Sequence, residues 1–220
     1  MEQDSDDENP VLSGSALDAL REFYVDRDAR LKQFEDLKKG AEENAAGQIL
    51  SMDAFAEDWN ESQFWYSEQT ATILAKELLQ GTTKDSVVAV VSAPSVFVAL
   101  KNEMARSGLA KEELPKVWLL EFDRRFEVFT EFVWYDFNEP CKLPPAMTVR
   151  WLSKSWGTTN EDNKVIVCTG ERMETLITSL YRPQGVLTTT FEPIHSKGLS
   201  NEFFCYANFE CEEWKWKSSS

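Results

Sequence analysis

The chain has 220 residues, 42% of them hydrophobic and 28% charged, which is the composition of a globular protein long enough to bury one full core. Its 23 basic and 38 acidic residues give a net charge of -15, and its isoelectric point is about 4.6. Nucleic-acid-binding proteins normally present a basic surface, so this charge argues against DNA or RNA as a partner and favours a basic protein. The longest hydrophobic stretch, 87–100, is too short to cross a bilayer, and we expect no membrane span.

The four cysteines, Cys141, Cys168, Cys205 and Cys211, form no CxxC pair, and the sequence does not open with a secretory signal. Both features indicate a reducing compartment, most simply the cytoplasm. Cys168 and Cys205 lie in hydrophobic, strand-like runs, where cysteine usually serves as a small core residue. Because His195 is the single histidine, a multi-histidine metal site is excluded, and we expect no metal ion.

The expected organisation has four parts. Residues 1–12 are acidic and poor in hydrophobic side chains, so they are predicted to be a disordered tail. In 13–52, hydrophobic residues at helical spacing predict a helix that runs to about residue 39 and is followed by a linker. The main domain is expected over 53–211, and 212–220 is expected to be a flexible C-terminal tail.

Strands and helices are predicted to alternate through the main domain. Hydrophobic runs bounded by turn residues predict six strands, and the segments between them predict helices. The strands are expected at 87–93, 117–123, 131–137, 164–169, 185–191 and 201–209, and the helices at 67–79, 95–107, 149–156 and 171–180. This order predicts an α/β fold whose twisted sheet is mostly parallel, with helices on both faces and one reversed strand near an edge.

Two consecutive predicted strands end on carboxylates, Glu121 and Asp123 on one and Asp136 on the next. In an open α/β sheet the ligand lies outside the carboxyl ends of the strands. Acids at these positions are placed to accept hydrogen bonds from ribose hydroxyls or an adenine amino group. The pattern therefore favours a cofactor that carries adenosine.

Each of these acids also has a purely structural interpretation. Strand alternation puts Glu121 and Asp123 on the same face, so the pattern does not decide which of them binds ribose. Either one is also able to form a salt bridge with Arg124 or Arg125 instead. Asp136 is expected to accept from adenine or ribose, and the alternative is that it caps its own loop.

Ser92, Ala93 and Pro94 form the turn between the first strand of the main domain and the helix that follows. Other nucleotide-binding sheets use glycine-rich turns at this place, because small residues let the backbone approach the ligand closely. We expect this turn to contact the cofactor, although small residues at such a turn are also common for structural reasons alone.

Several segments between residues 59 and 208 match one known family, and the sequence Gln-Phe-Trp-Tyr-Ser at 63–67 is the most distinctive of them. The other matching segments are 59–62, 91–96, 121–126, 135–140, 168–170, 193–195, 199, 201–203 and 205–206. With these segments the chain resembles the class I S-adenosylmethionine-dependent lysine methyltransferases of translation elongation factor 1-alpha. That family was formerly labelled adenine-specific DNA methyltransferase-like.

The resemblance implies a Rossmann-like fold, S-adenosylmethionine as cofactor, a basic protein substrate (elongation factor 1-alpha), and a cytoplasmic monomer. It also implies that the aromatic trio Phe64, Trp65 and Tyr66 contributes to the cofactor and substrate pocket, although such clusters are often ordinary core. The cofactor-binding residues expected on this basis are Phe64, Trp65, Tyr66, Ser92, Ala93, Pro94, Glu121, Asp123, Asp136 and Phe137.

One part of the family pattern is missing. The family has a further sheet strand that ends in Asp-Pro-Pro-Tyr/Phe, between the strand of Asp136 and the strand at 164–169. Here Leu143-Pro144-Pro145-Ala146 has the prolines without the acid or the aromatic, as if roughly twenty residues had been deleted. Unsatisfied backbone groups in such a gap cost about 1–3 kcal/mol each. The neighbouring strands therefore close up, or 147–151 replaces the strand, or the chain folds poorly.

The missing tetrapeptide would hold and orient the target amine, so its loss leaves the catalytic residues open. The candidates are Tyr66, His195 and Glu202. His195 and Glu202 are expected to line the lysine channel, and Glu202 or Tyr66 could assist deprotonation of the amine. His195 has the alternative of being an ordinary surface residue. Two other functions compete with lysine methylation: a catalytically impaired isoform or pseudoenzyme that binds cofactor or partner, and adenine-specific methylation of nucleic acid, which the acidic charge opposes.

Overall fold

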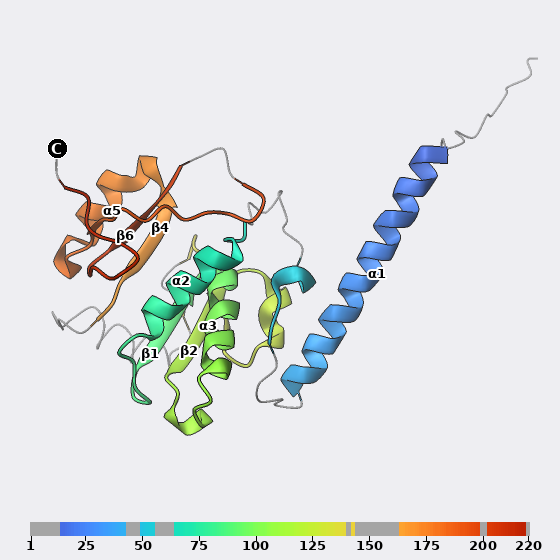
Figure 1. Cartoon of the computed structure of the whole chain (residues 1–220), viewed down its shortest axis with the longest axis horizontal. Coiled ribbons are helices and arrows are strands. Elements are labelled where there is room, and N and C mark those ends of the chain that lie inside the picture. Colours follow the sequence, from blue (N-terminus) through green and yellow to red (C-terminus); the bar gives the residue numbers. More distant parts are fainter. Residues whose placement is uncertain are drawn as a thin grey trace, which may run out of the picture.

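The computed structural model describes residues 14–42, 49–55, 64–139, 142–143, 163–198 and 202–218. The predicted tail at 1–12 and the predicted helix at 149–156 lie outside these residues. Helix α1 (Gly14–Glu42) extends away from the other described elements (Figure 1) and is followed by a short 3-10 turn, η1 (Met52–Ala54). The hydrophobic side chains of the predicted stripe on α1 are exposed: Leu17, Leu20, Phe23 and Tyr24. None of the helices in the described ranges is long and hydrophobic enough to span a bilayer.

Three parallel strands form the first sheet, in the order β1-β2-β3: β1 (Val87–Val91), β2 (Lys116–Glu121) and β3 (Phe132–Trp134). The connections carry α3 (Pro94–Arg106), η2 (Lys111–Glu113) and η3 (Arg124–Val128), and α2 (Glu68–Leu79) precedes β1. Helix α3 packs on β1 and β2, and α2 packs on α3, so both lie over the same sheet in Figure 1. The hydrophobic run of β1 is not buried on both faces, because Val88 and Val90 are buried whereas Val87 and Val91 are exposed.

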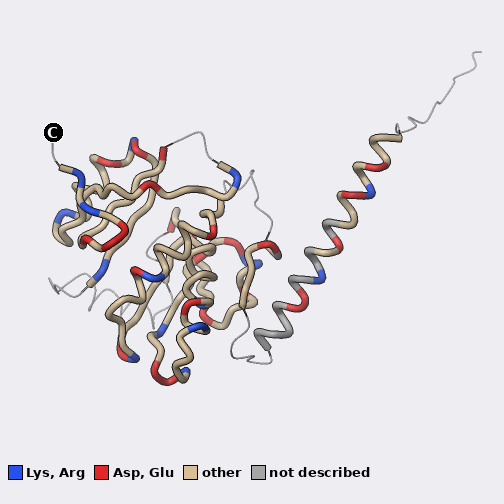
Figure 2. Tube along the Cα trace, in the orientation of Figure 1, with Lys and Arg blue, Asp and Glu red and all other residues tan. Residues whose placement is uncertain are grey.

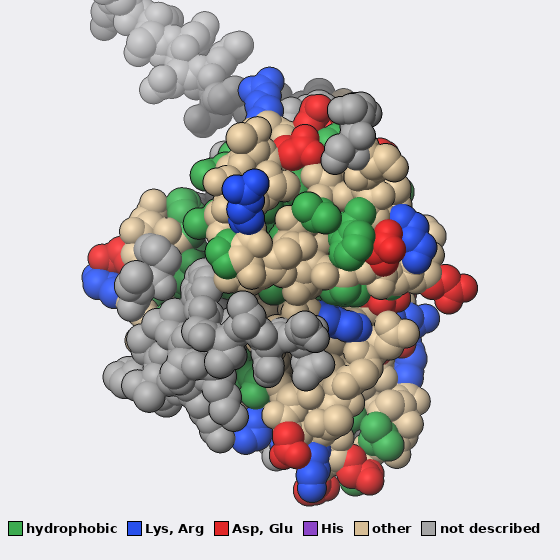
Figure 3. Space-filling model, turned by 90° about the vertical axis from the view of Figure 1, so that its left-hand side faces the viewer, with side chains coloured by type: hydrophobic (Ala, Val, Ile, Leu, Met, Phe, Trp, Pro, Cys, Tyr) green, Lys and Arg blue, Asp and Glu red, His purple; other side chains and the backbone are tan. Residues whose placement is uncertain are grey.

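The second sheet has the order β4-β6-β5 and consists of β4 (Ile166–Gly170), β5 (Leu187–Thr188) and β6 (Phe203–Ala207). Strand β6 is antiparallel to both neighbours, which confirms the predicted reversed strand. Between β4 and β5 lie η4 (Glu171–Met173), α5 (Glu174–Leu180) and η5 (Arg182–Gln184). Figure 3 faces this side of the molecule and shows hydrophobic side chains at its surface; the exposed ones on η4 and α5 are Met173, Leu176 and Leu180.

All six predicted strands are therefore present in the described part of the chain, and the α/β class is confirmed, but the strands form two sheets of three rather than one sheet. In the sheet of the family, the missing strand would lie between β1 and β4 and join the two halves. No described residue supplies a strand at that place. The segment 147–151, considered as its replacement, lies outside the described residues. One hydrophobic core nevertheless spans both halves, because Val88 and Leu119 of the first sheet belong to the same buried cluster as Ala207 of the second.

The C-terminal segment differs from the expected flexible tail. Trp214 is only 1% exposed, and its indole N–H donates to the carbonyl of Phe209 at 2.9 Å. The backbone beyond it pairs with the region of β5: the N–H of Thr190 donates to the Lys215 carbonyl at 2.7 Å, and the N–H of Lys217 donates to the Thr188 carbonyl at 2.8 Å. A buried tryptophan and these hydrogen bonds fix 214–217 against the sheet.

Candidate cofactor and substrate site

The carboxyl ends of β1, β2 and β3 bring three of the predicted residues into one row. Ser92, directly after β1, donates its backbone N–H to the carbonyl of Leu120 at 2.9 Å, next to Glu121. The N–H of Tyr135 donates to the Glu121 carbonyl at 3.0 Å, which places Asp136 beside the end of β2. The sheet edge therefore carries Ser92, Glu121 and Asp136 as neighbours, as an open α/β site requires.

Glu121 is the last residue of β2 and is only 7% exposed. Its Oε1 accepts two backbone N–H groups, from Phe122 at 2.8 Å and from Asp123 at 3.1 Å. Burial raises the pKa of this carboxyl above its ordinary value, and the two N–H bonds oppose that rise. Among the described residues both hydrogen bonds to this carboxyl use the same oxygen, so Oε2 is the atom left to accept from a ligand.

Asp123 is placed differently from what strand alternation predicted, because β2 ends at Glu121 and Asp123 caps η3. Its Oδ1 accepts the backbone N–H of Arg125 at 2.9 Å, and its Oδ2 accepts from the Arg125 side chain through Nε at 2.8 Å. This is the salt-bridge alternative. Both carboxylate oxygens are occupied, so of the two acids the geometry favours Glu121 for a ribose.

Asp136 is half-buried in the loop after β3. Its Oδ1 accepts from Asn138 twice, from the backbone N–H at 2.8 Å and from Nδ2 at 3.0 Å, so the residue does cap its loop. As in Glu121, both bonds use one oxygen and leave the second, Oδ2, for a ligand. Phe137 follows and is 73% exposed, so a hydrophobic ring stands beside that oxygen without a place in the core.

The turn between β1 and α3 has the backbone shape of a ligand-binding turn. Ser92 is exposed and has a φ of 50°, in the left-handed region that non-glycine residues seldom adopt. Ala93 is the N-cap of α3 and makes no side-chain cap bond, while Pro94, buried, is the first helical residue. The N-terminus of this 13-residue helix brings positive partial charge to the turn, although Pro94 has no N–H and the N–H groups of Val96 and Phe97 donate to the Ala93 carbonyl at 3.0 and 3.2 Å.

The aromatic trio divides between core and site. Trp65 is a core residue: its indole N–H donates to the Phe55 carbonyl at 2.9 Å, and its ring meets Phe126 edge-on at 6.0 Å. Phe64 is half-buried. Tyr66 lies at the site, because its backbone N–H donates to Ser95 Oγ, in the first turn of α3, at 3.2 Å.

His195 is buried, at 8% exposure, and so is not the surface residue considered as its alternative. Its ring lies between those of Tyr66, with centroids 4.8 Å apart, and Phe203, at 4.6 Å. Backbone bonds fasten this arrangement, since Ser67 N–H donates to the Ile194 carbonyl at 2.8 Å and Ser196 N–H donates to the Trp65 carbonyl at 2.9 Å. A single histidine in a loop gives no sequence signal for such burial.

The catalytic candidates have unequal support. The hydroxyl of Tyr66 lies near Cys168 on β4, and burial raises its pKa well above the ordinary value. A phenol with that pKa stays protonated at neutral pH, so Tyr66 acts as a hydrogen-bond donor and a wall of the site, not as a base. Glu202 is exposed at the start of β6, where its backbone carbonyl accepts the N–H of Glu171 at 3.0 Å.

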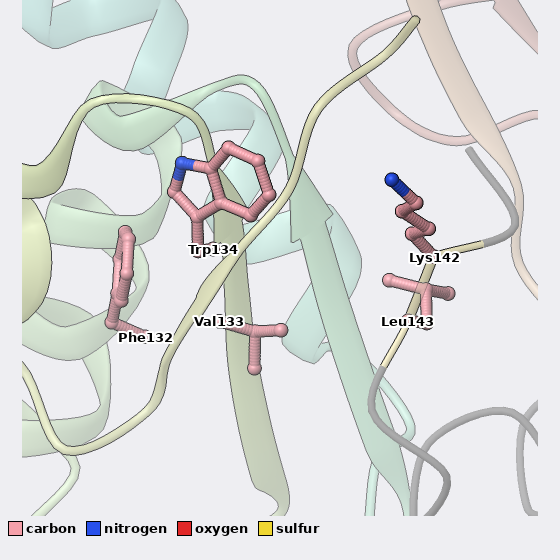
Figure 4. A pocket seen from close by; sticks show the side chains of 5 residues that line it. All are labelled: Phe132, Val133, Trp134, Lys142 and Leu143. Carbon is pink, nitrogen blue, oxygen red and sulfur yellow. The ribbon is translucent and has the colours of Figure 1, made fainter. Parts of the chain in front are cut away.

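A hollow of about 580 Å³ lies against β3 (Figure 4). Phe132 and Trp134 line it from alternate positions of the strand, and the remaining lining residues are Val133, Lys142 and Leu143. Neither Ser92 nor Glu121 lines it, so it is not the site that the acids define. Ser95 and the facing cysteines Cys168 and Cys205 lie at the site but were not predicted as site residues. For Cys168, the match of 168–170 to the family was a signal in the sequence.

Parallel strands with acids at their carboxyl edge and a small-residue turn before α3 define an α/β fold of the Rossmann-like methyltransferase class. The chain matches the family model described as "Probable N6-adenine methyltransferase" over residues 57–148 and 144–211. It is 37% identical to protein-lysine N-methyltransferase EFM5 of Saccharomyces cerevisiae, over 94% of this chain and 95% of that protein. It is 34% identical to EEF1A lysine methyltransferase 1 of Homo sapiens (93% and 94% covered) and of Gallus gallus (94% and 97%). The chain belongs to this family of protein-lysine N-methyltransferases.

The comparisons also bear on the missing strand. The family model matches in two segments that meet at 144–148, where the Asp-Pro-Pro-aromatic strand was expected. The alignment with the yeast protein covers 244 positions, more than the 220 residues of this chain, so that relative has residues without a counterpart here. Membership in the family implies a methyl donor and a protein substrate.

Proposed function

We propose that this protein is an S-adenosylmethionine-dependent lysine N-methyltransferase that acts on translation elongation factor 1-alpha in the cytosol. The observation that carries the proposal is the pair Glu121 and Asp136, each with one carboxylate oxygen bonded within its own loop and the other left over at the sheet edge. The substrate is inferred from the names of the relatives, which are methyltransferases of this factor or of protein lysine.

The residues at the edge fit the cofactor by their chemistry. Oε2 of Glu121 would accept from the ribose hydroxyls, and Oδ2 of Asp136 would accept from the second ribose hydroxyl or the adenine amino group. The positive partial charge at the N-terminus of α3 suits the carboxylate of the methionine part. When bound, the cofactor supplies a methyl group on a positively charged sulfur, ready for in-line transfer to an amine.

The charge of the chain supports a basic protein substrate. With a net charge of -15 the protein steers a positively charged partner toward itself during encounter. Figure 2 shows that Lys and Arg are interspersed with Asp and Glu along the described trace, without a continuous basic stripe. For this reason, methylation of adenine in nucleic acid, which the printed name of the family model suggests, is not supported.

At the amine, the residues of this chain contribute orientation and exclusion of water. Tyr66 and His195 form a packed aromatic wall next to the first turn of α3. A lysine amine must lose its proton before transfer, and the tetrapeptide that holds the amine in the family is absent from the sequence.

This absence favours a second candidate function, a catalytically impaired form that binds cofactor or partner without turnover. The match to the family model in two segments supports it as well. The two candidates share the cofactor site at Glu121 and Asp136 and differ only in chemistry at the amine.

Two measurements separate them. Calorimetric titration with S-adenosylmethionine tests the site itself, and absence of binding would refute both the enzyme and an impaired form that keeps the cofactor. Transfer of a radiolabelled methyl group to purified elongation factor 1-alpha then tests turnover. The matched control is a variant in which the Asp-Pro-Pro-aromatic strand of a relative is inserted between Thr148 and Val149. Activity of the unaltered chain supports the enzyme, whereas binding with activity only in the insertion variant identifies the impaired form.

A further inference from the structure

Cys168 on β4 and Cys205 on β6 are directly opposite residues of an antiparallel pair. In an antiparallel ladder, facing residues alternate between hydrogen-bonded and non-hydrogen-bonded pairs. The hydrogen bonds at both ends of this ladder show to which kind Cys168 and Cys205 belong. Asn208 N–H donates to the Val165 carbonyl at 3.3 Å, and Glu171 N–H donates to the Glu202 carbonyl at 3.0 Å, so both of these facing pairs are of the hydrogen-bonded kind. Counting along the ladder, the two kinds alternate, and Cys168 with Cys205 is a non-hydrogen-bonded pair.

Only this kind of pair brings the side chains of facing residues close together. The Cα atoms of a non-hydrogen-bonded pair lie about 4.5 Å apart, at the short end of the range of about 4.4–6.8 Å found in disulfides. The two thiols are close enough for each to shift the pKa of the other. A covalent bond between the two sulfur atoms therefore needs no movement of either strand.

The two thiols differ in exposure and in acidity. Cys205 is completely buried, at 0% exposure, while Cys168 is half-exposed. The neighbouring Cys168 thiol lowers the pKa of the Cys205 thiol, whereas Cys205 raises the pKa of the Cys168 thiol. An oxidant in solution reaches Cys168 first, and the more acidic thiol stands next to it.

We propose that Cys168 and Cys205 are a redox modification site that closes to a reversible cross-strand disulfide when a peroxide is the oxidant. The sulfur of Cys168 attacks hydrogen peroxide, the O–O bond breaks, and the products are a Cys168 sulfenic acid and one water molecule. The sulfur of Cys205 then attacks the Cys168 sulfur, the S–O bond breaks, and a second water leaves as the S–S bond forms. Two thiols lose two electrons and two protons, and one peroxide becomes two water molecules.

The disulfide would also act on the candidate site. The Tyr66 hydroxyl lies near the Cys168 sulfur in the reduced protein. Turning that sulfur toward Cys205 on oxidation would therefore alter the contact between the aromatic wall and β4. This consequence for the site rests on the proposed function, whereas formation of the disulfide does not.

The test uses a variant with Cys141→Ser and Cys211→Ser, in which Cys168 and Cys205 are the only cysteines. The folded protein is treated with hydrogen peroxide, unfolded with an alkylating reagent, and analysed by intact mass and by peptide mapping without reductant. We expect a loss of two hydrogen masses, no alkyl group, a cross-linked peptide pair that contains both cysteines, and full reversal by dithiothreitol. The matched control adds Cys168→Ser, which should leave Cys205 open to alkylation and form no intramolecular cross-link.

Two results would overturn the proposal. One is that both thiols of the treated protein are still alkylated after unfolding. The other is that Cys168 is oxidised to sulfinic acid without any cross-link to Cys205. Circular dichroism before treatment shows whether the variant is folded. If the variant is unfolded, the same peroxide treatment and peptide mapping are carried out on the unaltered chain.

Discussion

The hydroxyl of Tyr66 lies near Cys168, while the backbone N–H of the same tyrosine donates to Ser95 Oγ at 3.2 Å. Since Ser95 lies in the first turn of α3 beside the first sheet and Cys168 lies on the second, one residue contacts both halves of the fold at the candidate site. Tyr66→Phe removes only the hydroxyl contact and should lower the free energy of unfolding by about 1 kcal/mol, measured by urea denaturation.

The control for this variant is Tyr206→Phe. The hydroxyl of Tyr206 is buried without a hydrogen-bond partner among the described residues, and burial raises its pKa to about 12. Removing an unsatisfied buried hydroxyl should leave stability unchanged or increase it. Equal losses in the two variants would show that the Tyr66 contact adds nothing.

Glu121→Gln should weaken the binding of S-adenosylmethionine about tenfold, about 1.4 kcal/mol, because it replaces a charged acceptor for a ribose hydroxyl by a neutral one. The matched variant is Asp123→Asn, whose carboxylate is occupied by Arg125. It should leave the affinity within about twofold. Calorimetric titration measures both, and the reverse ranking would assign the ribose to Asp123.

Asp136→Ala should abolish cofactor binding, because it removes the acceptor after β3 as well as the cap of its loop. The control is Asn138→Ala, which takes away the side-chain donor to Asp136 but keeps the backbone N–H bond of 2.8 Å. Asn138→Ala should retain binding. An unchanged affinity in Asp136→Ala would remove Asp136 from the site.

The ion pair of Lys101 on α3 with Glu131 at the start of β3 predicts a pH dependence of stability. Burial alone would raise the pKa of Glu131, but the Lys101 ammonium outweighs it and the pKa is lowered from its ordinary value of 4.5. The ionised form is therefore the one that stabilises the fold. Its contribution is complete above the ordinary pKa and is lost as the pH falls through the lowered one.

Glu131→Gln should accordingly be less stable than the unaltered protein by about 1 kcal/mol at pH 7. The difference should shrink as the pH falls below 4.5, where the unaltered protein also loses the charge. Thermal unfolding at a series of pH values measures this. A difference that does not depend on pH would indicate lost packing instead of a lost charge.

Trp214→Ala should lower the free energy of unfolding by about 3–5 kcal/mol, because it removes a buried indole from the shared core. Trp216→Ala is the comparison, since Trp216 is partly exposed. It should have a clearly smaller effect, measured by thermal unfolding. Similar values for both would contradict the packed C-terminal segment.

The order and kind of the elements in the main domain could be predicted because the signals are local. Val87–Val91 is a hydrophobic run between turn residues, Ser67 caps α2 through a 3.2 Å bond from Thr70 N–H, and Gly81 adopts the left-handed conformation that ends that helix. Such signals act within a few residues. They predicted all six strands, though not their ends.

The details of the site depend on interactions that spacing does not contain. Asp123 is not part of the predicted strand, because it caps the 3-10 turn η3 instead. His195 is buried because its loop is hydrogen-bonded to a segment that is distant in the sequence. The facing of Cys168 and Cys205 follows from the register of two strands that lie far apart in sequence. The packed tail was missed because Trp214 stands among charged residues, where composition suggests exposure.

The pairing of Lys215–Lys217 with the region of β5 has a consequence for how the protein is made. The strands of the first sheet pair with the next strand to be synthesised, so that half is able to assemble while translation continues. The second sheet needs β6 between two strands made earlier, and the final residues against its edge. It is completed only after residues 215–217 have been synthesised, so the first half is able to fold while the second still lacks β6 and the segment that pairs with β5.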